Sequence, residues 1–131
     1  EAAFATFHLP PRWDRGNITY QIYWTVGNFT DTGSCAWRLY DHGFGDGSII
    51  SQSFGPDWGL SITDAANGSA RTLNITAESA NSTVGGSLAN DSFIHIRVLR
   101  DAEDAADTLT IDAGLLGVMV HYTSDQGNDD V

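Results

Sequence analysis

The sequence predicts a single all-β domain, either a sandwich or a barrel. Apolar residues alternate with polar ones in most ordered segments, which is the spacing of a half-buried strand. Clusters of glycine, proline, asparagine and aspartate separate these segments, as expected at tight turns. Only one segment favours a helix. Together these observations indicate eight or so short strands with one helical crossover.

The longest alternating segment spans residues 17–26, and four more span 35–40, 72–77, 92–100 and 115–122. Side chains two apart share one face of a strand, so each segment predicts an inward set. The predicted core consists of Ile18, Tyr20, Ile22, Trp24, Trp37, Leu39, Leu73, Ile75, Ile94, Ile96, Val98, Val118 and Val120. Shorter strand candidates lie at 3–8, 48–54, 60–63 and 82–84.

The helical candidate spans residues 101–109, before the last strand. Asp101 is a suitable N-cap, and Ala102, Ala105 and Ala106 favour helix. The segment is therefore predicted to be a short crossover helix, with Asp104 and Asp107 in solvent. The folded domain is expected to span residues 1–124, followed by a flexible acidic tail at 125–131.

The charge balance disfavours two classes of partner. Seventeen acidic residues face six basic ones, all of them arginine, and the formal net charge is −11. Such a chain repels nucleic-acid backbones and anionic membranes. The longest apolar stretch, 115–120, is also far shorter than the roughly 20 residues of a membrane-spanning helix.

The chain has no recognisable motif for catalysis or for a cofactor. It has no phosphate-binding glycine loop, no nucleophile elbow and no histidine pair at zinc spacing. Two acidic groups are candidate calcium ligands, Asp101/Asp104/Asp107 and Asp41/Asp46/Asp57. Their spacing does not match an EF-hand loop, and solvated carboxylates explain them. We therefore expect no enzyme activity, no cofactor and no metal.

Other residues allow more than one interpretation. Six of the seven asparagines stand in Asn-x-Ser/Thr triplets, typical either of glycosylation or of polar sheet faces. Cys35, the only cysteine, is expected to be a buried and inert thiol. Five aromatic residues could stack on a sugar or cap the core: Trp13, Tyr40, Phe44, Phe54 and Trp58.

The outward faces of the late strands are not cleanly polar, which predicts an interface. The predicted contact surface consists of Phe93, His95, Arg97, Leu115 and Met119. His95 and His121 are expected on adjacent strands, and protonation near pH 6 would loosen this surface if the histidines are buried in it.

Three stretches of the sequence resemble small virion proteins of tailed phages. They are Trp-Asp-Arg-Gly-Asn-Ile-Thr at 13–19, Val-Leu-Arg-Asp-Ala-Glu-Asp-Ala-Ala-Asp-Thr-Leu at 98–109, and Leu-Leu-Gly-Val at 115–118. The resemblance covers residues 4–123, although 31–70 matches nothing in it. It implies a β-sandwich of jelly-roll type on the capsid surface. The implied function is a non-enzymatic cement or decoration protein, homotrimeric and bound to the major capsid protein; the alternative is a carbohydrate- or receptor-binding head of a fibre.

Overall fold

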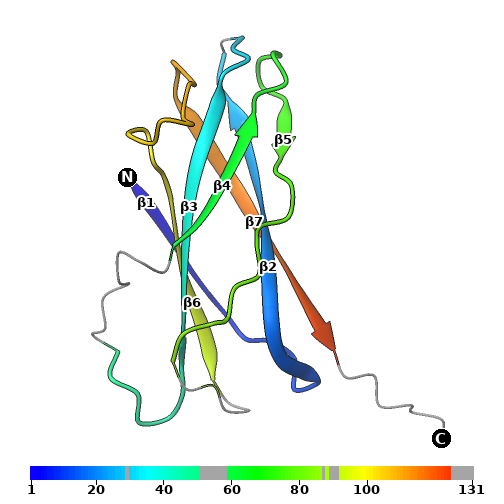
Figure 1. The fold of residues 1–131 in the computed structure, drawn as a ribbon, viewed down its shortest axis with the longest axis vertical. Helices are drawn as coiled ribbons and strands as arrows, with labels where there is room; N and C mark the ends of the chain where they lie inside the picture. Colours follow the sequence, from blue (N-terminus) through cyan, green and yellow to red (C-terminus); the bar gives the residue numbers. More distant parts are fainter. Residues whose placement is uncertain (29, 51–58, 87, 89–91, 125–131) are drawn as a thin grey trace, which may run out of the picture.

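The computed structural model describes residues 1–28, 30–50, 59–86, 88 and 92–124, and it shows two antiparallel sheets. The first sheet contains β1 (Ala2–Phe7), β6 (Phe93–Arg100), β3 (Ser34–Phe44) and β4 (Leu60–Ala65), in that order. The second contains β5 (Leu73–Ile75), β2 (Trp13–Val26) and β7 (Ala113–Ser124). The two sheets form facing layers (Figure 1), so the predicted all-β class is confirmed and the architecture is consistent with a sandwich.

The core lies between the sheets and contains most of the predicted residues. Alternation in β2 is obeyed without exception from Ile18 to Val26, and the aromatic rings of Trp24 and Trp37 meet edge to face in the middle. Nine predicted core residues are buried: Ile18, Tyr20, Ile22, Trp24, Trp37, Leu39, Ile94, Ile96 and Val98. Val118 and Val120 are half-buried and pack against this cluster.

The predicted inward face of β5 is wrong. Leu73 and Ile75 point to solvent, whereas Asn74 and Thr76 are buried. The two polar side chains accept backbone hydrogen bonds, Asn74 from the amide of Asn67 (3.0 Å) and Thr76 from the amide of Ile22 (3.0 Å). Satisfying buried amides at the sheet edge outweighs burial of the two apolar side chains.

The inward set of β7 changes phase at a β-bulge. Leu115 pairs with Trp24 and Gly117 pairs with Tyr23, so Leu116 has no partner on β2. Leu115 therefore packs against the core, as Val118 and Val120 do, and Leu116 is exposed. Strict alternation predicted the opposite orientation for both leucines.

The predicted helical crossover is also wrong, because residues 102–106 form turns and a bend and the rest of 101–109 has no regular structure. The amides of Asp104 and Asp107 bond to the carbonyls three residues earlier, and a carboxylate oxygen of Asp104 accepts from the amide of Ala106. Side-chain bonds of this kind compete with helix. The connection also donates backbone bonds to Ser34 and Ala36, and so replaces a neighbouring strand at the start of β3.

Among the shorter candidates, 3–8 and 60–63 correspond to β1 and β4. The candidate at 82–84 forms only an isolated bridge between Ser82 and Ile18. Residues 48–50 of the candidate at 48–54 are not strand, and the rest lies outside the described residues, as does the expected tail at 125–131. No helix in the described part of the chain could cross a membrane.

The two long sides of the sandwich differ. On the β5 side, residues 76–82 continue beside β2, with Thr76 bonded to Ile22 and Ser79 to Tyr20. The chain then crosses to the other sheet, where Gly85 bridges to His42 (Figure 1). On the opposite side, β1 and β7 are the edge strands of their sheets and no ladder joins them.

Candidate functional site

The outer face of the three-stranded sheet carries a group of apolar side chains, which we call the apolar face. Its members are Tyr23, Leu73, Ile75, Leu116 and Met119. The strand register places four of them on one sheet face, and the unpaired Leu116 is exposed at the bulge beside it. Tyr23 pairs with Ile75 on one side and with Gly117 on the other, and Met119 pairs with the outward Gln21.

These side chains are accessible to a partner. Leu116 is 60% exposed, Leu73 51%, Ile75 48% and Met119 42%. They make up half of the large hydrophobic residues exposed in the described chain. Gly117 leaves open space beside Tyr23, since an added Cβ would meet nothing within 4 Å. Isolated exposed leucines carry little information, but a group on one sheet face indicates an interaction surface.

The five residues predicted as an interface do not share one surface. Phe93, His95 and Arg97 lie on the outer face of the four-stranded sheet, whereas Leu115 points inward from the other sheet. Met119 alone belongs to the apolar face. The prediction placed β6 and β7 side by side, whereas the structure places them in different sheets.

The aromatic side chains on the outer face of the four-stranded sheet contact one another. Phe4 stacks on His95 with ring centroids 5.7 Å apart, and Phe93 stacks on Phe44 at 5.5 Å. The guanidinium of Arg97 lies over the ring of Tyr40 at 5.5 Å. His95 pairs with His42 of β3, and not with His121, which lies in the other sheet beside Gln21 at 2.8 Å.

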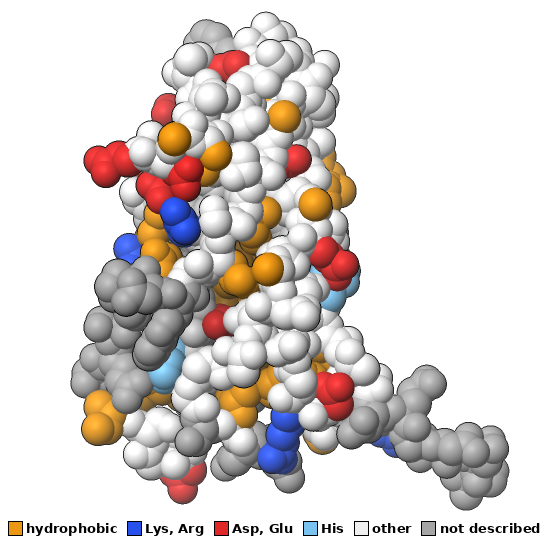
Figure 2. All heavy atoms as spheres, in the orientation of Figure 1, with side chains coloured by type: hydrophobic (Ala, Val, Ile, Leu, Met, Phe, Trp, Pro, Cys, Tyr) orange, Lys and Arg blue, Asp and Glu red, His pale blue; other side chains and the backbone are white. Residues whose placement is uncertain are grey.

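The carboxylates of the connection between β6 and β7 bind arginines. Figure 2 shows acidic side chains gathered there, at the upper left, beside a basic one. Asp101 and Asp104 bond to Arg38 at 3.1 and 3.0 Å, and Asp107 binds Arg100. The Asp107 side chain is only 2% exposed, so the prediction of solvated carboxylates is wrong at this position. No group of three or more metal-ligating side chains converges within the described residues.

A second buried carboxylate, Asp41 of β3, ties the two sheets together. One of its oxygens accepts hydrogen bonds from the hydroxyls of Tyr20 and Ser82, both at 2.7 Å. Burial, together with the charge of Asp41 and this hydrogen bond, raises the pKa of Tyr20 well above its ordinary value. Both hydroxyls serve as donors to a fixed acceptor, which stabilises the fold and leaves neither poised as a nucleophile.

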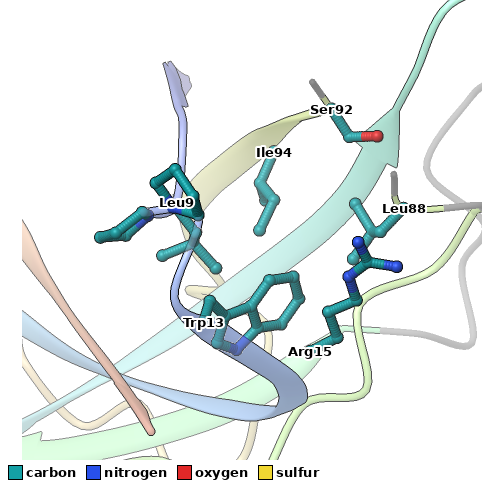
Figure 3. A pocket seen from close by; sticks show the side chains of 8 residues that line it. Leu9, Trp13, Arg15, Leu88, Ser92 and Ile94 are labelled. Carbon is teal, nitrogen blue, oxygen red and sulfur yellow. The ribbon is translucent and has the colours of Figure 1, made fainter. Parts of the chain in front are cut away.

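The pocket in Figure 3 is too small for an organic ligand. Leu9, Trp13, Leu88 and Ile94 line it, with Arg15 at its side, and its volume is about 20 Å³. That volume holds about one water molecule. Arg15 lies in the left-handed region with φ 59°, at the irregular start of β2.

The remaining sugar and glycosylation candidates are dispersed. Phe44 is buried, Trp13 packs against the core and Tyr40 lies on β3, while Phe54 and Trp58 lie outside the described residues. Asn74 is buried and accepts a backbone bond, so its side chain is not accessible to a glycan. The aromatic candidates described therefore form no common platform.

Comparisons of this chain with protein-family models, with curated proteins and with solved structures found no match.

Proposed function

We propose that this chain is a non-enzymatic structural protein of a tailed-phage virion, most specifically a decoration protein on the capsid surface. The observation that carries the protein–protein part of the proposal is the apolar face. A sheet face that meets water is normally polar, and this one presents Leu73, Ile75 and Met119 among polar residues such as Gln21 and Thr25.

The occupant we propose for this face is a second copy of the chain, in a homotrimer. The virion assignment, the threefold symmetry and a jelly-roll topology all come from the sequence resemblance. The apolar face supports the protein–protein part of the proposal, because subunit interfaces are richer in apolar side chains than the ordinary surface. The net charge of −11 keeps such an assembly soluble and away from nucleic acid.

The solution mass tests the interface. Wild-type protein at tens of micromolar is expected to have the mass of a trimer, and Ile75→Asp to be monomeric because it places a charge in the contact. Thr63→Asp is the matched control, an exposed position on β4 of the other sheet, and should leave the trimer intact. A monomeric wild type, or a trimeric Ile75→Asp, would contradict this interface.

Co-expression with the major capsid protein of the same genome tests the virion role. The decorated shell should contain the chain at a fixed stoichiometry and resist heat better than the bare shell. Absence of the chain from purified shells, or absence of a capsid gene from that genome, would exclude the role.

A carbohydrate- or receptor-binding fibre head is the second candidate. Its supporting observation is Phe4, which is 60% exposed, stacks on His95 and neighbours Thr6. An exposed ring beside polar groups suits a sugar face. Glycan-array binding that Phe4→Ala abolishes and Leu73→Ala does not would favour this candidate over the first.

A further inference from the structure

We infer that the open side of the sandwich, between β1 and β7, is an acceptor groove for one extended strand of a partner protein. The partner strand carries apolar side chains at alternate positions and a basic residue at the end that lies near Glu1 and Asp112. The groove lies between the two sheets and adjoins the apolar face at Leu116, and the inference does not depend on the virion role.

The groove exists because β1 supplies very small inward side chains. The strand register pairs Ala3 with Val98 and Ala5 with Ile96, both core positions of β6. Alanines at these two positions stay exposed and leave a hollow of about 410 Å³. Its walls are apolar, with Ile96 and Val98 on one sheet and Leu115, Val118 and Val120 on the other.

A second hollow of about 580 Å³ continues the groove past the start of β1, since the two share Ala3, Val98 and Leu115. Together they extend along Glu1 and the whole of β1 to Phe7. A strand of six residues, the length of β1, is about 20 Å long, so the groove suits a short extended peptide.

Both walls offer unpaired backbone. Residues 3–7 of β1 and 115–118 of β7 line the hollow consecutively, which places a strand edge at each wall. No other described strand pairs with either edge. An inserted strand would satisfy these groups by β-augmentation, and its alternate side chains would fill the space above Ala3 and Ala5.

The contrast with the β5 side of the sandwich supports the role of the β1–β7 side as an acceptor groove. There the chain's own residues 76–82 run beside β2, and Ser82 reaches the buried carboxylate of Asp41. No equivalent segment covers the β1–β7 side within the described residues. The alternating apolar segments of the described chain already belong to the two sheets, and the occupant we propose is a strand of another protein.

The charges at the rim define one end of that occupant. Glu1 and Asp112 line the second hollow, and Arg100 beside them is engaged with Asp107 and with two backbone carbonyls. Arg100 also interacts with the charge of Asp112, but the three carboxylates of Glu1, Asp107 and Asp112 outnumber this one guanidinium, so the side-chain charge of the rim is negative. Because β1 and β7 both run away from this end, a strand antiparallel to both places its C-terminal residue against the carboxylates.

The probe is a synthetic peptide, acetyl-Thr-Val-Thr-Val-Thr-Val-Lys-amide, titrated into the full chain and followed by backbone amide NMR. We expect saturable shifts and slower hydrogen exchange at residues 3–7 and 115–118. Replacing the Lys of the peptide with Asp should weaken binding several-fold. Replacing the central valine with proline should abolish binding, because proline lacks the backbone N–H that donates to the neighbouring strand.

A groove-filling variant supplies the matched test. Ala5→Leu puts a side chain into the hollow and should weaken binding of the peptide about tenfold or more. Ala65→Leu makes the same change at an exposed position on β4, the opposite edge of the same sheet, and should bind as wild type. Ala5→Leu adds apolar contacts in an existing hollow, so its melting temperature should not fall.

Three outcomes would overturn the inference: no shifts at the highest soluble peptide concentration, equal binding by Ala5→Leu, or self-association of the chain that Ala5→Leu abolishes. The last would identify the occupant as a second copy. Ile75→Asp separates this inference from the proposed function, since it disrupts the trimer and should still bind the peptide.

Discussion

Arg100, at the end of β6, holds the carboxylate of Asp107 in a two-point ion pair, with Nε–Oδ2 at 2.9 Å and Nη2–Oδ1 at 2.6 Å. The same carboxylate accepts a hydrogen bond from the backbone amide of Ala36. The guanidinium also donates a hydrogen bond to the carbonyl of Ile111. The pair thereby joins β3, β6 and the connection to β7. Bidentate geometry of this kind is the strong form of the arginine–carboxylate contact.

We predict that Asp107→Asn destabilises the fold by about 3–5 kcal/mol, since it leaves a partly buried guanidinium without its counter-charge. Urea unfolding measures the loss. Asp112→Asn, at an exposed carboxylate close by, is the control and should stay within about 0.5 kcal/mol of wild type. Equal effects of the two substitutions would mean that the ion pair contributes nothing specific.

The same ion pair predicts a pH dependence. The hydrogen bond from Arg100 lowers the pKa of Asp107 below its ordinary value in the folded state. Its contribution to stability is therefore fully present above the unfolded pKa of about 3.9, and is lost as pH falls through the folded value. The difference in unfolding free energy between wild type and Asp107→Asn should thus shrink below about pH 4. A constant difference down to the acid transition would contradict this assignment.

Tyr20→Phe tests the tie between the two sheets. It removes one of the two hydroxyl donors that the described residues offer to the buried carboxylate of Asp41, the other being Ser82. We expect a loss of about 1–3 kcal/mol, the cost of an under-satisfied buried acceptor. A double-mutant cycle with Asp41→Ala isolates the interaction, because the loss from Tyr20→Phe should largely vanish once Asp41 is absent. Additive losses would show that the two residues are not coupled.

Two substitutions compare the inward and outward positions of the three-stranded sheet. Trp24→Ala should cost about 3–5 kcal/mol, because Trp24 is fully buried, packs on Trp37 and donates to Asp64 at 2.9 Å. Leu73→Ala should change stability of the monomer by less than about 0.5 kcal/mol, because the side chain lies in solvent. Chemical denaturation at low protein concentration separates these effects from assembly.

The sequence pattern predicted the central strands because burial alone decides their faces. Ile18 to Val26 and Ile94 to Val98 lie between two layers, where every second position has to be apolar. Leu115 and Leu116 could not be oriented from alternation, since one unpaired residue in β7 reverses the phase. Leu73 and Ile75 were misplaced for another reason, because their polar neighbours satisfy amides of distant residues.

The candidate site was harder to predict than the core. Alternation places Met119 outward but assigns Leu73 and Ile75, which lie across β2 on the same sheet face, to the interior, so it does not predict the apolar face as a group. The groove was not predictable either, since it depends on which strands lie at the sheet edges. A clue existed in Ala3 and Ala5, which are small residues at inward positions of a strand.

The final prediction concerns Cys35, which the sequence placed correctly in the interior. The thiol is fully buried, and burial raises its pKa to about 12. Only the thiolate reacts with alkylating reagents. At pH 8 the thiolate fraction is then about 10⁻⁴, against roughly a quarter for an exposed cysteine. Iodoacetamide should therefore leave the folded protein unlabelled over a time that fully labels the protein in urea.

Residual labelling of Cys35 in buffer reports opening of the core. Asp107→Asn loosens the adjacent connection, so this substitution should accelerate the labelling in proportion to the stability that it removes. Mass spectrometry of timed aliquots measures both rates. Rapid labelling of the native wild type would show that the start of β3 opens locally, without unfolding of the sandwich.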